Sequence, residues 1–418
     1  MLDCSLVKEC LNRLNVLYKF YCRGFQKAVK EVVKHFDWTE PALIKGAGSV
    51  VRLADEVRNN HVDSVLIVTD KGISKLGLTR QLLVALNEHG IRCTVYDDTN
   101  PDPSIENVEQ ARRVYIDNGC KGIIAFGGGS PMDCAKTAAA RIARPDKPVE
   151  KMRMPLAIRK PLPPLFAVPT TAGTGSETSI AAVVSNARTK EKFAIMDPVL
   201  RPKYAVLDAE LTVGLPQHIT STTGMDALTH AVEAYIGKSN TPETSLAAEK
   251  AVKLIFENLL TAYTDGKNLT ARENMLEAAY YAGLAFTRAY VGYVHAIAHC
   301  LGGAYHIPHG LGNAVALPYV LDAFGASAHE RLARLAVVAG IVTTEKTDEQ
   351  KALLFIEKIR ELNRQMSIPE GFDAIKPSDV APFAKRAFKE GNPMYPVPRI
   401  FSLKEFEDLF NKLRANNA

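Results

Sequence analysis

Histidines are concentrated in one short segment of the chain. Residues 295–310, HAIAHCLGGAYHIPHG, contain four of the 10 histidines among 418 residues. A hydrophobic core gains little from imidazole, whereas imidazole is the commonest side-chain metal ligand. His295 and His299 are four positions apart, so a helix would place both side chains on one face. With His309 in the Pro-His-Gly turn that follows, the segment predicts a metal site.

A second pair with the same spacing, Asp226 and His230, stands in the predicted helix GMDALTHAVEAY. One carboxylate with several neutral imidazoles forms a nitrogen-rich ligand set, which suits Fe(II) or Zn(II) and suits Mg(II) or Ca(II) poorly. The HAIAH segment lacks the glutamate of the motif HExxH, which is the general base of zinc proteases. The pattern therefore favours a metal centre of another kind.

A glycine-rich loop in IIAFGGGSPMDCAK connects a predicted strand to a predicted helix. Ser130 suits the N-cap of this helix and Asp133 the third position after it, as in a capping box. Glycines would let a pyrophosphate approach the N–H groups at the helix N-terminus. The loop is not a GxGxxG fingerprint, and a tight strand-to-helix turn without a ligand is the alternative. The candidate phosphate-binding residues are Gly128, Gly129, Ser130 and Asp133.

A second polar loop, VPTTAGTGSE, follows another apolar strand. Thr170, Thr171 and Thr174 supply hydroxyl groups on a backbone that Gly173 and Gly175 make pliable. A polar turn without a ligand is the alternative here as well. Two such loops at the carboxyl ends of parallel strands fit a dinucleotide that lies across the sheet edge.

The elements that must position these residues change character along the chain. Five apolar runs ending in Gly, Asp or Pro predict strands: VDSVLIVTD, IRCTVYDD, KGIIAFGGG, PLFAVP and KYAVLD. The segments between them are long enough for helices, which predicts βαβ units and a mostly parallel sheet, and AAVVSNARTKEKFAIM predicts a hairpin. After Pro216 the apolar pattern becomes helical. We expect a helical extension over 1–40, a Rossmann-like α/β dinucleotide-binding domain over 41–215 and an all-helical metal-binding domain over 216–418.

Residues 5–36 predict one long amphipathic helix. Apolar residues alternate spacings of four and three, the heptad pattern of a helix that packs on another. These residues are Val7, Leu11, Leu14, Tyr18, Tyr21, Phe25, Ala28 and Val32. We expect the helix to serve intramolecular packing or subunit contact.

Composition restricts the class of protein. The net charge of +5 is dispersed, without a Lys/Arg block of the kind that binds nucleic acid. The seven cysteines form no CxxC pair, the first residues lack a secretory signal, and no run is apolar enough to span a membrane. These features predict a cytoplasmic, soluble protein with reduced thiols that binds neither nucleic acid nor membrane.

Four motifs in this order, GGGSPMDCAK, PTTAGTGSE, GMDALTHAVEAY and VHAIAHCLGGAYHIPHG, resemble those of the iron-containing (group III) alcohol dehydrogenases. The resemblance extends from about Pro41 to the C-terminus and implies a dehydroquinate synthase-like fold. It also implies that Asp226, His230, His295 and His309 hold the metal. His299 would then lie between metal, substrate and nicotinamide, and the two loops, with Lys192 nearby, would bind the dinucleotide. Two departures are the N-terminal helix and Cys300, where many members have proline.

The resemblance implies hydride transfer between a primary alcohol or its aldehyde and NAD(H), with Fe(II), or Zn(II) as a substitute, acting on the substrate oxygen. Asp70 at the end of SVLIVTD would accept hydrogen bonds from the adenosine ribose and disfavour NADP. The family also implies a homodimer or larger homo-oligomer. Alternatives are a glycerol dehydrogenase-like or other polyol or hydroxyacid dehydrogenase of the superfamily, and a non-catalytic metal-binding assembly protein.

Overall fold

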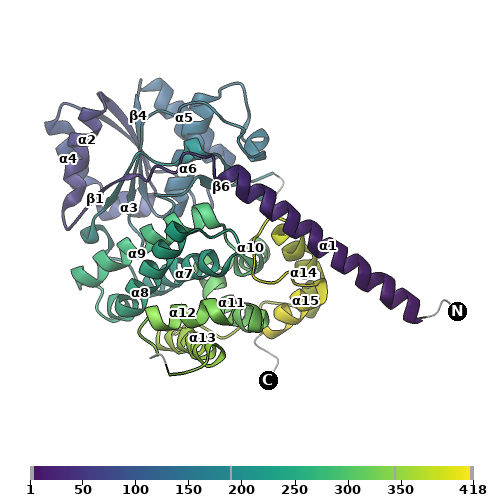
Figure 1. Ribbon diagram of the computed structural model, residues 1–418. Helices are drawn as coiled ribbons and strands as arrows, with labels where there is room; N and C mark the ends of the chain where they lie inside the picture. The colour runs from purple at the N-terminus through teal and green to yellow at the C-terminus, as the bar shows by residue number, and fades with distance from the viewer. Residues whose placement is uncertain (1–3, 189–190, 343–344, 415–418) are drawn as a thin grey trace. The chain divides into compact units, whose positions relative to one another are not determined.

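The computed structural model describes residues 4–188, 191–342 and 345–414, with side chains described from Val16 onward (Figure 1). A six-stranded sheet has the order β1-β8-β5-β4-β2-β3, and all of its pairs are parallel. Its strands are β1 (Ala42–Lys45), β2 (Ser64–Val68), β3 (Arg92–Tyr96), β4 (Gly122–Gly127), β5 (Leu165–Pro169) and β8 (Tyr204–Leu207). The five predicted strands and the parallel sheet are confirmed, and β1 is an additional strand.

Helices cover both faces of this sheet (Figure 1). They are α2 (Leu53–Asn59), α3 (Lys71–Leu76), α4 (Arg80–Glu88), α5 (Ile105–Asp117) and α6 (Gly129–Ala143). Successive side chains of a strand point to opposite faces, so Leu66 and Ile123 belong to the core under α5 and α6. Ile67 and Ile124 belong to the opposite core, with residues of α2 and α4. Burial on both faces explains why the central strands are apolar without alternation.

The predicted hairpin is also present. Strands β6 (Ala181–Asn186) and β7 (Glu191–Met196) pair antiparallel in a separate two-stranded sheet. Beyond β8, the described residues contain helices and no strand. These helices are α7 (Gln217–Ile236), α8 (Pro242–Thr264), α9 (Leu269–Ala289), α10 (Tyr293–Tyr305), α11 (His309–Phe324), α12 (His329–Val338), α13 (Asp348–Gln365), α14 (Pro377–Gly391) and α15 (Leu403–Lys412). The predicted order of an α/β part followed by a helical part is confirmed.

The chain forms two compact units that do not follow the sequence continuously. One contains residues 37–227 and 254–287, with the sheet, and the other contains residues 1–36, 228–253 and 288–418. The predicted boundaries at 40 and 215 divide the chain in another way, and they stay a prediction. Within the described ranges, no helix is both long and apolar enough to cross a membrane.

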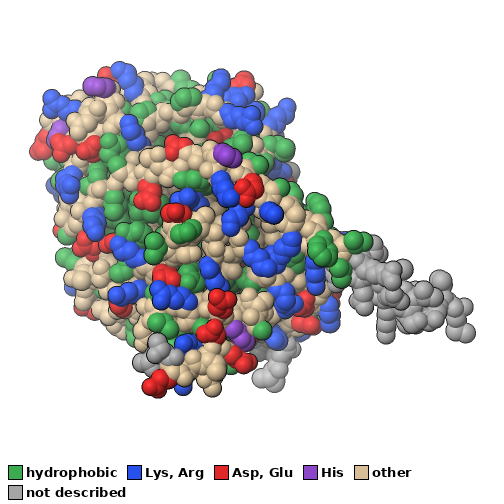
Figure 2. Space-filling model, viewed as in Figure 1, with side chains coloured by type: hydrophobic (Ala, Val, Ile, Leu, Met, Phe, Trp, Pro, Cys, Tyr) green, Lys and Arg blue, Asp and Glu red, His purple; other side chains and the backbone are tan. Residues whose placement is uncertain are grey.

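The N-terminal helix α1 (Cys4–Val33) agrees with the predicted helix, while the packing or subunit contact expected of its heptad face stays a prediction. Tyr21 and Val32 of that face are more than half exposed, and so are Leu17 and Phe20 beside it. Hydrophobic side chains of α1 accordingly reach the surface (Figure 2). The helix contacts its own unit through Tyr18, which stacks on Phe388, and through polar side chains, such as the buried Gln26, that bind backbone carbonyls.

Candidate active site

The four predicted metal ligands converge. Asp226 and His230 lie one turn apart on α7, His295 lies in the first turn of α10, and His309 begins α11. One ligand atom from each of the four lies within 4.8 Å of the others. The ring centroid of His295 lies 4.6 Å from that of His230 and 5.3 Å from that of His309. Asp226, His230 and His295 are buried, while His309 is half-buried. This is a compact set of one carboxylate and three imidazoles.

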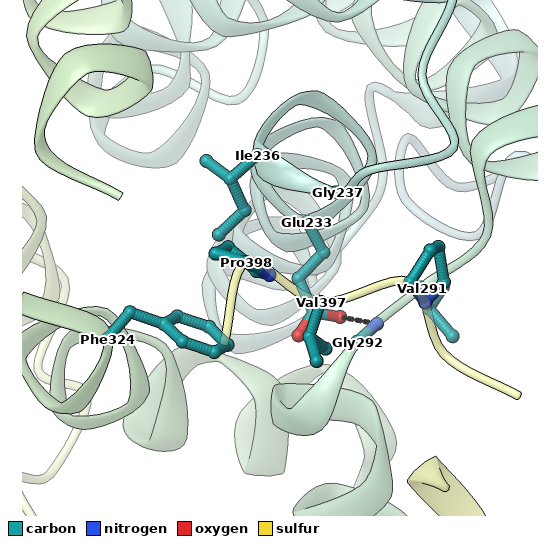
Figure 3. Close-up of a pocket in the computed structure, with 9 residues that line it drawn as sticks. Glu233, Ile236, Gly237, Val291, Gly292, Phe324, Val397 and Pro398 are labelled. Atoms are coloured by element: carbon teal, nitrogen blue, oxygen red, sulfur yellow. Dashed lines mark hydrogen bonds between the residues drawn. The ribbon is translucent and has the colours of Figure 1, made fainter. Parts of the chain in front are cut away.

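Glu233 organises the start of α10. Its carboxylate accepts hydrogen bonds from the backbone N–H groups of Gly292 and Val294 and from Nδ1 of His295, each at 2.7 Å (Figure 3 shows the bond from Gly292). The side chain thus caps a helix whose N-cap residue, Gly292, has none. Burial raises the pKa of Glu233, and hydrogen bonds from the backbone of Gly292, Val294 and His295 oppose that rise. With Nδ1 of His295 engaged, its Nε2 remains for a metal.

The electrostatics of the group suit a cation. Burial, followed by the neighbouring His230, His309 and His299, holds the pKa of His295 well below its usual value of 6.5. His295 is therefore neutral, which is the form that ligates metals. The donor set, rich in neutral nitrogen with one carboxylate, fits Fe(II) or Zn(II).

His299 points elsewhere. It is not part of the converging group, and its Nδ1 lies 2.6 Å from Oε1 of Glu390 on α14. Its ring is stacked on that of His309 with centroids 5.2 Å apart, and its side chain is 33% exposed. His299 thus stands beside the ligand group while one edge reaches solvent. Its expected role between metal and substrate stays a prediction.

Asn313 is a further residue of the group. It is fully buried one turn after His309 on α11, and its Nδ2 lies 3.3 Å from Nε2 of His295 and 3.2 Å from Nε2 of His309. These are ring nitrogens of two predicted ligands, so the amide borders the point on which the ligands converge.

The glycine loop departs from the prediction at its helix cap. Helix α6 begins at Gly129 with Gly128 at the N-cap and no side-chain cap, so the predicted Ser130 cap and its capping box with Asp133 are wrong. The hydroxyl of Ser130 instead accepts a hydrogen bond from the backbone N–H of Asp102. Gly127 has a φ of +149°, and a Cβ there would meet Pro131 at 2.6 Å. The chain therefore turns into α6 earlier than a serine cap would allow, and only glycine fits that turn.

The two predicted nucleotide loops pack on each other. A Cβ at Gly128 would contact Oγ1 of Thr171 at 3.3 Å, and one at Gly129 would contact Cγ2 of Thr174 at 3.0 Å. The backbone N–H of Thr170 donates to the carbonyl of Gly127. The structure thus brings these five candidate residues together at the carboxyl ends of β4 and β5, where a doubly wound sheet binds ligands.

Three other cofactor candidates have structural contacts of their own. Asp133 accepts hydrogen bonds at 3.0 Å from Oγ of Ser176 and from the backbone N–H of Val183, which ties α6 to the second loop and the hairpin. Lys192 on β7 forms an ion pair with Asp102. Asp70 is the N-cap of α3, where Oδ1 accepts from the N–H of Ile73 at 3.0 Å. Their predicted contacts with a cofactor remain untested.

Sequence reasoning missed Glu233, Glu390 and Asn313. A glutamate inside the apolar stretch THAVEAYI was a usable signal, because a buried carboxylate requires partners. No such signal marks Glu390, which stands in a charged helix 91 positions after His299. His306 is the C-cap of α10, in the left-handed region at φ +56°, and is exposed.

Cys300, the predicted departure beside His299, is buried on the side of α10 that packs on α14. Its thiol donates to the carbonyl of Phe383 at 3.7 Å, and burial raises its pKa to about 12. The thiol is therefore protonated at neutral pH and serves packing.

Comparison with known proteins identifies the family of the chain. Residues 41–209 match the family described as "Iron-containing alcohol dehydrogenase", and residues 220–413 match "Fe-containing alcohol dehydrogenase family, C-terminal". Alcohol dehydrogenase 4 of Saccharomyces cerevisiae (strain YJM789) is 39% identical over 354 residues, which cover 84% of this chain and 91% of that protein.

Solved structures are similar as well. A crystal structure of 1,3-propanediol oxidoreductase has a TM-score of 0.87 and 36% identity. The match covers 90% of this chain and 99% of the oxidoreductase chain. The structure of sulfoacetaldehyde reductase from Bifidobacterium kashiwanohense in complex with NAD+ has a TM-score of 0.81 and 28% identity. The match covers 91% of this chain and 99% of the reductase chain. The fold, the ligand set and these similarities define an alcohol dehydrogenase, which is an oxidoreductase. The chain belongs to the iron-containing alcohol dehydrogenase family.

Proposed function

We propose that this alcohol dehydrogenase interconverts a primary alcohol and its aldehyde with NAD(H) at a divalent metal held by Asp226, His230, His295 and His309. The convergence of these four side chains within 4.8 Å carries the proposal. The 1,3-propanediol activity in the name of one structural relative supports a primary alcohol, and the NAD+ complex of another supports the cofactor.

Bound Fe(II), or Zn(II) in its place, would supply Lewis acidity toward the substrate oxygen, and bound NAD(H) would accept or supply the hydride of the carbinol carbon. The residues of the chain prepare this chemistry. Glu233 fixes the tautomer of His295, so that Nε2 is the ligating atom. Burial of three of the four ligands keeps bulk water from competing.

Oxidation of the alcohol releases one proton, and in this proposal His299 receives it. Glu390 accepts from Nδ1, so Nε2 is the basic nitrogen available to the reacting group. The side chain is one-third exposed, which gives the proton a path to solvent. In the reverse direction the same nitrogen returns a proton to the oxygen as the aldehyde is reduced.

The packed loops would hold the dinucleotide. The free backbone N–H groups at the start of α6 suit its pyrophosphate, and Gly128, Gly129, Thr170, Thr171 and Thr174 line this surface. Three further side chains support this surface. Ser130 accepts a hydrogen bond from the N–H of Asp102, Lys192 of the hairpin pairs with Asp102, and Asp133 accepts from Ser176. Asp70 would bind the adenosine ribose through the carboxylate oxygen that does not cap α3.

A substrate panel tests this function. Primary alcohols, diols, glycerol, hydroxyacids and the matching aldehydes would be assayed with NAD(H) and NADP(H) on protein reconstituted with Fe(II) or Zn(II). We expect turnover of a primary alcohol with NAD(H) that disappears after chelation and returns with metal. Preference for glycerol or a hydroxyacid, or full activity without metal, would contradict the proposal. The expected homo-oligomer and its cytoplasmic location remain predictions; sedimentation of the purified protein tests the former.

A further inference from the structure

We propose that Glu390 is the positioning residue of His299, and that helix α1 holds Glu390 in place through the loop of residues 392–398. The effect on turnover rests on the proposed role of His299, whereas the contact itself can be tested without catalysis. All of the residues involved belong to one compact unit.

The first contact fixes the imidazole. Oε1 of Glu390 lies 2.6 Å from Nδ1 of His299, and an ionised carboxylate can only accept a hydrogen bond. Nδ1 must therefore carry the proton, which leaves a lone pair on Nε2. The contact also restrains the ring, because the same imidazole stacks on His309 from the other direction. Orientation and tautomer are thus both set by Glu390.

The second contact fixes the glutamate. The hydroxyl of Tyr395 donates to the same Oε1 of Glu390 at 3.0 Å. Burial, with the neighbouring Glu390, raises the pKa of Tyr395 well above 10, so the hydroxyl remains a donor at every working pH. One carboxylate oxygen therefore receives two donors, and its position depends on where the loop places Tyr395.

The loop needs outside donors. The segment NPMYPVP over residues 392–398 contains three prolines, which have no N–H, so the loop has few donors for its own carbonyls. Within it, the N–H of Val397 donates to the carbonyl of Tyr395, and from outside it the N–H of Lys238 donates to the carbonyl of Pro396. Helix α1 supplies further donors. Nε2 of Gln26 donates to the carbonyls of Pro393 and Tyr395 at 3.1 and 2.8 Å. The guanidinium of Arg23 donates to those of Val397 and Pro398 at 2.8 and 2.9 Å.

The same loop also borders the other glutamate of the site. Val397 and Pro398 line a small pocket together with Glu233 and Gly292 (Figure 3). A Cβ at Gly292 would lie 2.7 Å from Oε1 of Glu233 and 3.5 Å from Val397, so these groups are closely packed. Helix α1 therefore supports the surroundings of both carboxylates, the one that holds His295 and the one that holds His299.

This support lies outside the part of the chain that defines the family. The family matches begin at residue 41, whereas Arg23 and Gln26 precede it. A helix added before the family domains would serve the site by holding a loop that has too few donors of its own.

Substitution at Gln26 tests whether helix α1 holds the loop of residues 392–398 in place. Gln26→Glu keeps the size of the side chain but replaces the NH2 group, which makes both donations, with one carboxylate oxygen facing the two carbonyls. We expect kcat to fall by roughly 10- to 100-fold, which is the effect of a small misplacement of a catalytic group. KM and metal content should stay within about two-fold of the wild-type values. Lys27→Gln is the control, because Lys27 is exposed on the same helix and the substitution changes the charge by the same amount. An equal kcat in Gln26→Glu and Lys27→Gln would contradict the proposal that α1 holds Glu390 in place through the loop.

The contact with Glu390 is tested by ¹⁵N NMR of histidine-labelled, metal-free full-length protein. In the wild type we expect His299 to be protonated at Nδ1 and not at Nε2. Glu390→Gln keeps an oxygen acceptor and should retain this tautomer, whereas Glu390→Leu should lose it, and Tyr395→Phe should broaden the signal. A tautomer unchanged in Glu390→Leu would overturn the positioning role. Full turnover in His299→Ala would instead contradict the proposed function of His299. The NMR measurement would still decide whether Glu390 positions the imidazole of His299.

Discussion

Nδ1 of His295 donates to Oε2 of Glu233 across 2.7 Å, and both side chains are almost completely buried. A histidine ligand held in this way presents a fixed nitrogen to a metal, and loss of such an orienting partner typically costs about 10- to 100-fold in metal affinity. We therefore expect Glu233→Gln to weaken metal binding by about that factor, because its amide N–H group would face either the donor of Val294 or the donors of Gly292 and His295. Competition with a chromophoric chelator measures the affinity. Glu243→Gln, at an exposed position of α8, is the control, and an affinity equal to that control would contradict the role of Glu233.

The histidines of the segment should separate by metal content. His295→Ala removes a ligand and should abolish both bound metal and turnover. His299→Ala should retain about one metal ion per chain while turnover falls by roughly 10²- to 10⁴-fold, the range for loss of a general acid–base. Metal analysis and kinetics on the same samples decide between them. His306→Asn is the matched control, since His306 is exposed and asparagine tolerates its left-handed backbone. Metal loss in His299→Ala equal to that in His295→Ala would make His299 a ligand.

Asp70 offers a clean test of cofactor choice. We expect the wild type to prefer NAD(H), because a carboxylate that binds the ribose hydroxyls repels the 2′-phosphate of NADP. Asp70→Gly should shift the ratio of kcat/KM values toward NADP(H). The substitution also removes the N-cap of α3, but glycine at an N-cap costs only a few tenths of a kcal/mol, so folding should survive. A wild type that works faster with NADPH, or a variant with an unchanged ratio, would refute this use of Asp70.

The second nucleotide loop depends on a close approach to α9. A Cβ at Gly283 would lie 2.2 Å from Oγ1 of Thr178 and 2.8 Å from the carbonyl of Gly175. Gly283→Ala should therefore destabilise the protein by about 1–3 kcal/mol, as overpacked cores do. Urea unfolding measures the change. Gly214→Ala has open space around its Cβ and should leave the midpoint nearly unchanged. A Gly283→Ala variant as stable as Gly214→Ala would mean that the loop can move away from α9.

The ligand spacing could be predicted because it is local. Asp226 and His230 lie one turn apart on α7, and the chain carries the HAIAH and Pro-His-Gly segments so close together that two helix ends must meet. The strands of the sheet were equally visible, since burial on both faces leaves continuous apolar runs. Strand β1 was not, because ALIK is short and stands between proline and glycine.

What the sequence could not show depends on partners far along the chain. The capping of α10 by Glu233 joins residues 59 and 61 positions apart, and the Glu390–His299 contact joins residues 91 apart. The heptad pattern of α1 predicts a packing face, but it says nothing of the polar side chains that also attach the helix. No local pattern reveals that the acceptors of Arg23 and Gln26 are carbonyls of a proline-rich loop.

The attachment of α1 also has a consequence for the order in which the molecule is completed. Gln26 and Tyr395 are separated by 369 positions, so the whole stretch between them must be synthesised before this contact can form. The contact is thus among the last to be made, because closing so long a loop comes late in folding. A nascent chain stopped short of residue 392 would carry a complete set of metal ligands, while Arg23 and Gln26 would still lack the loop that they bind.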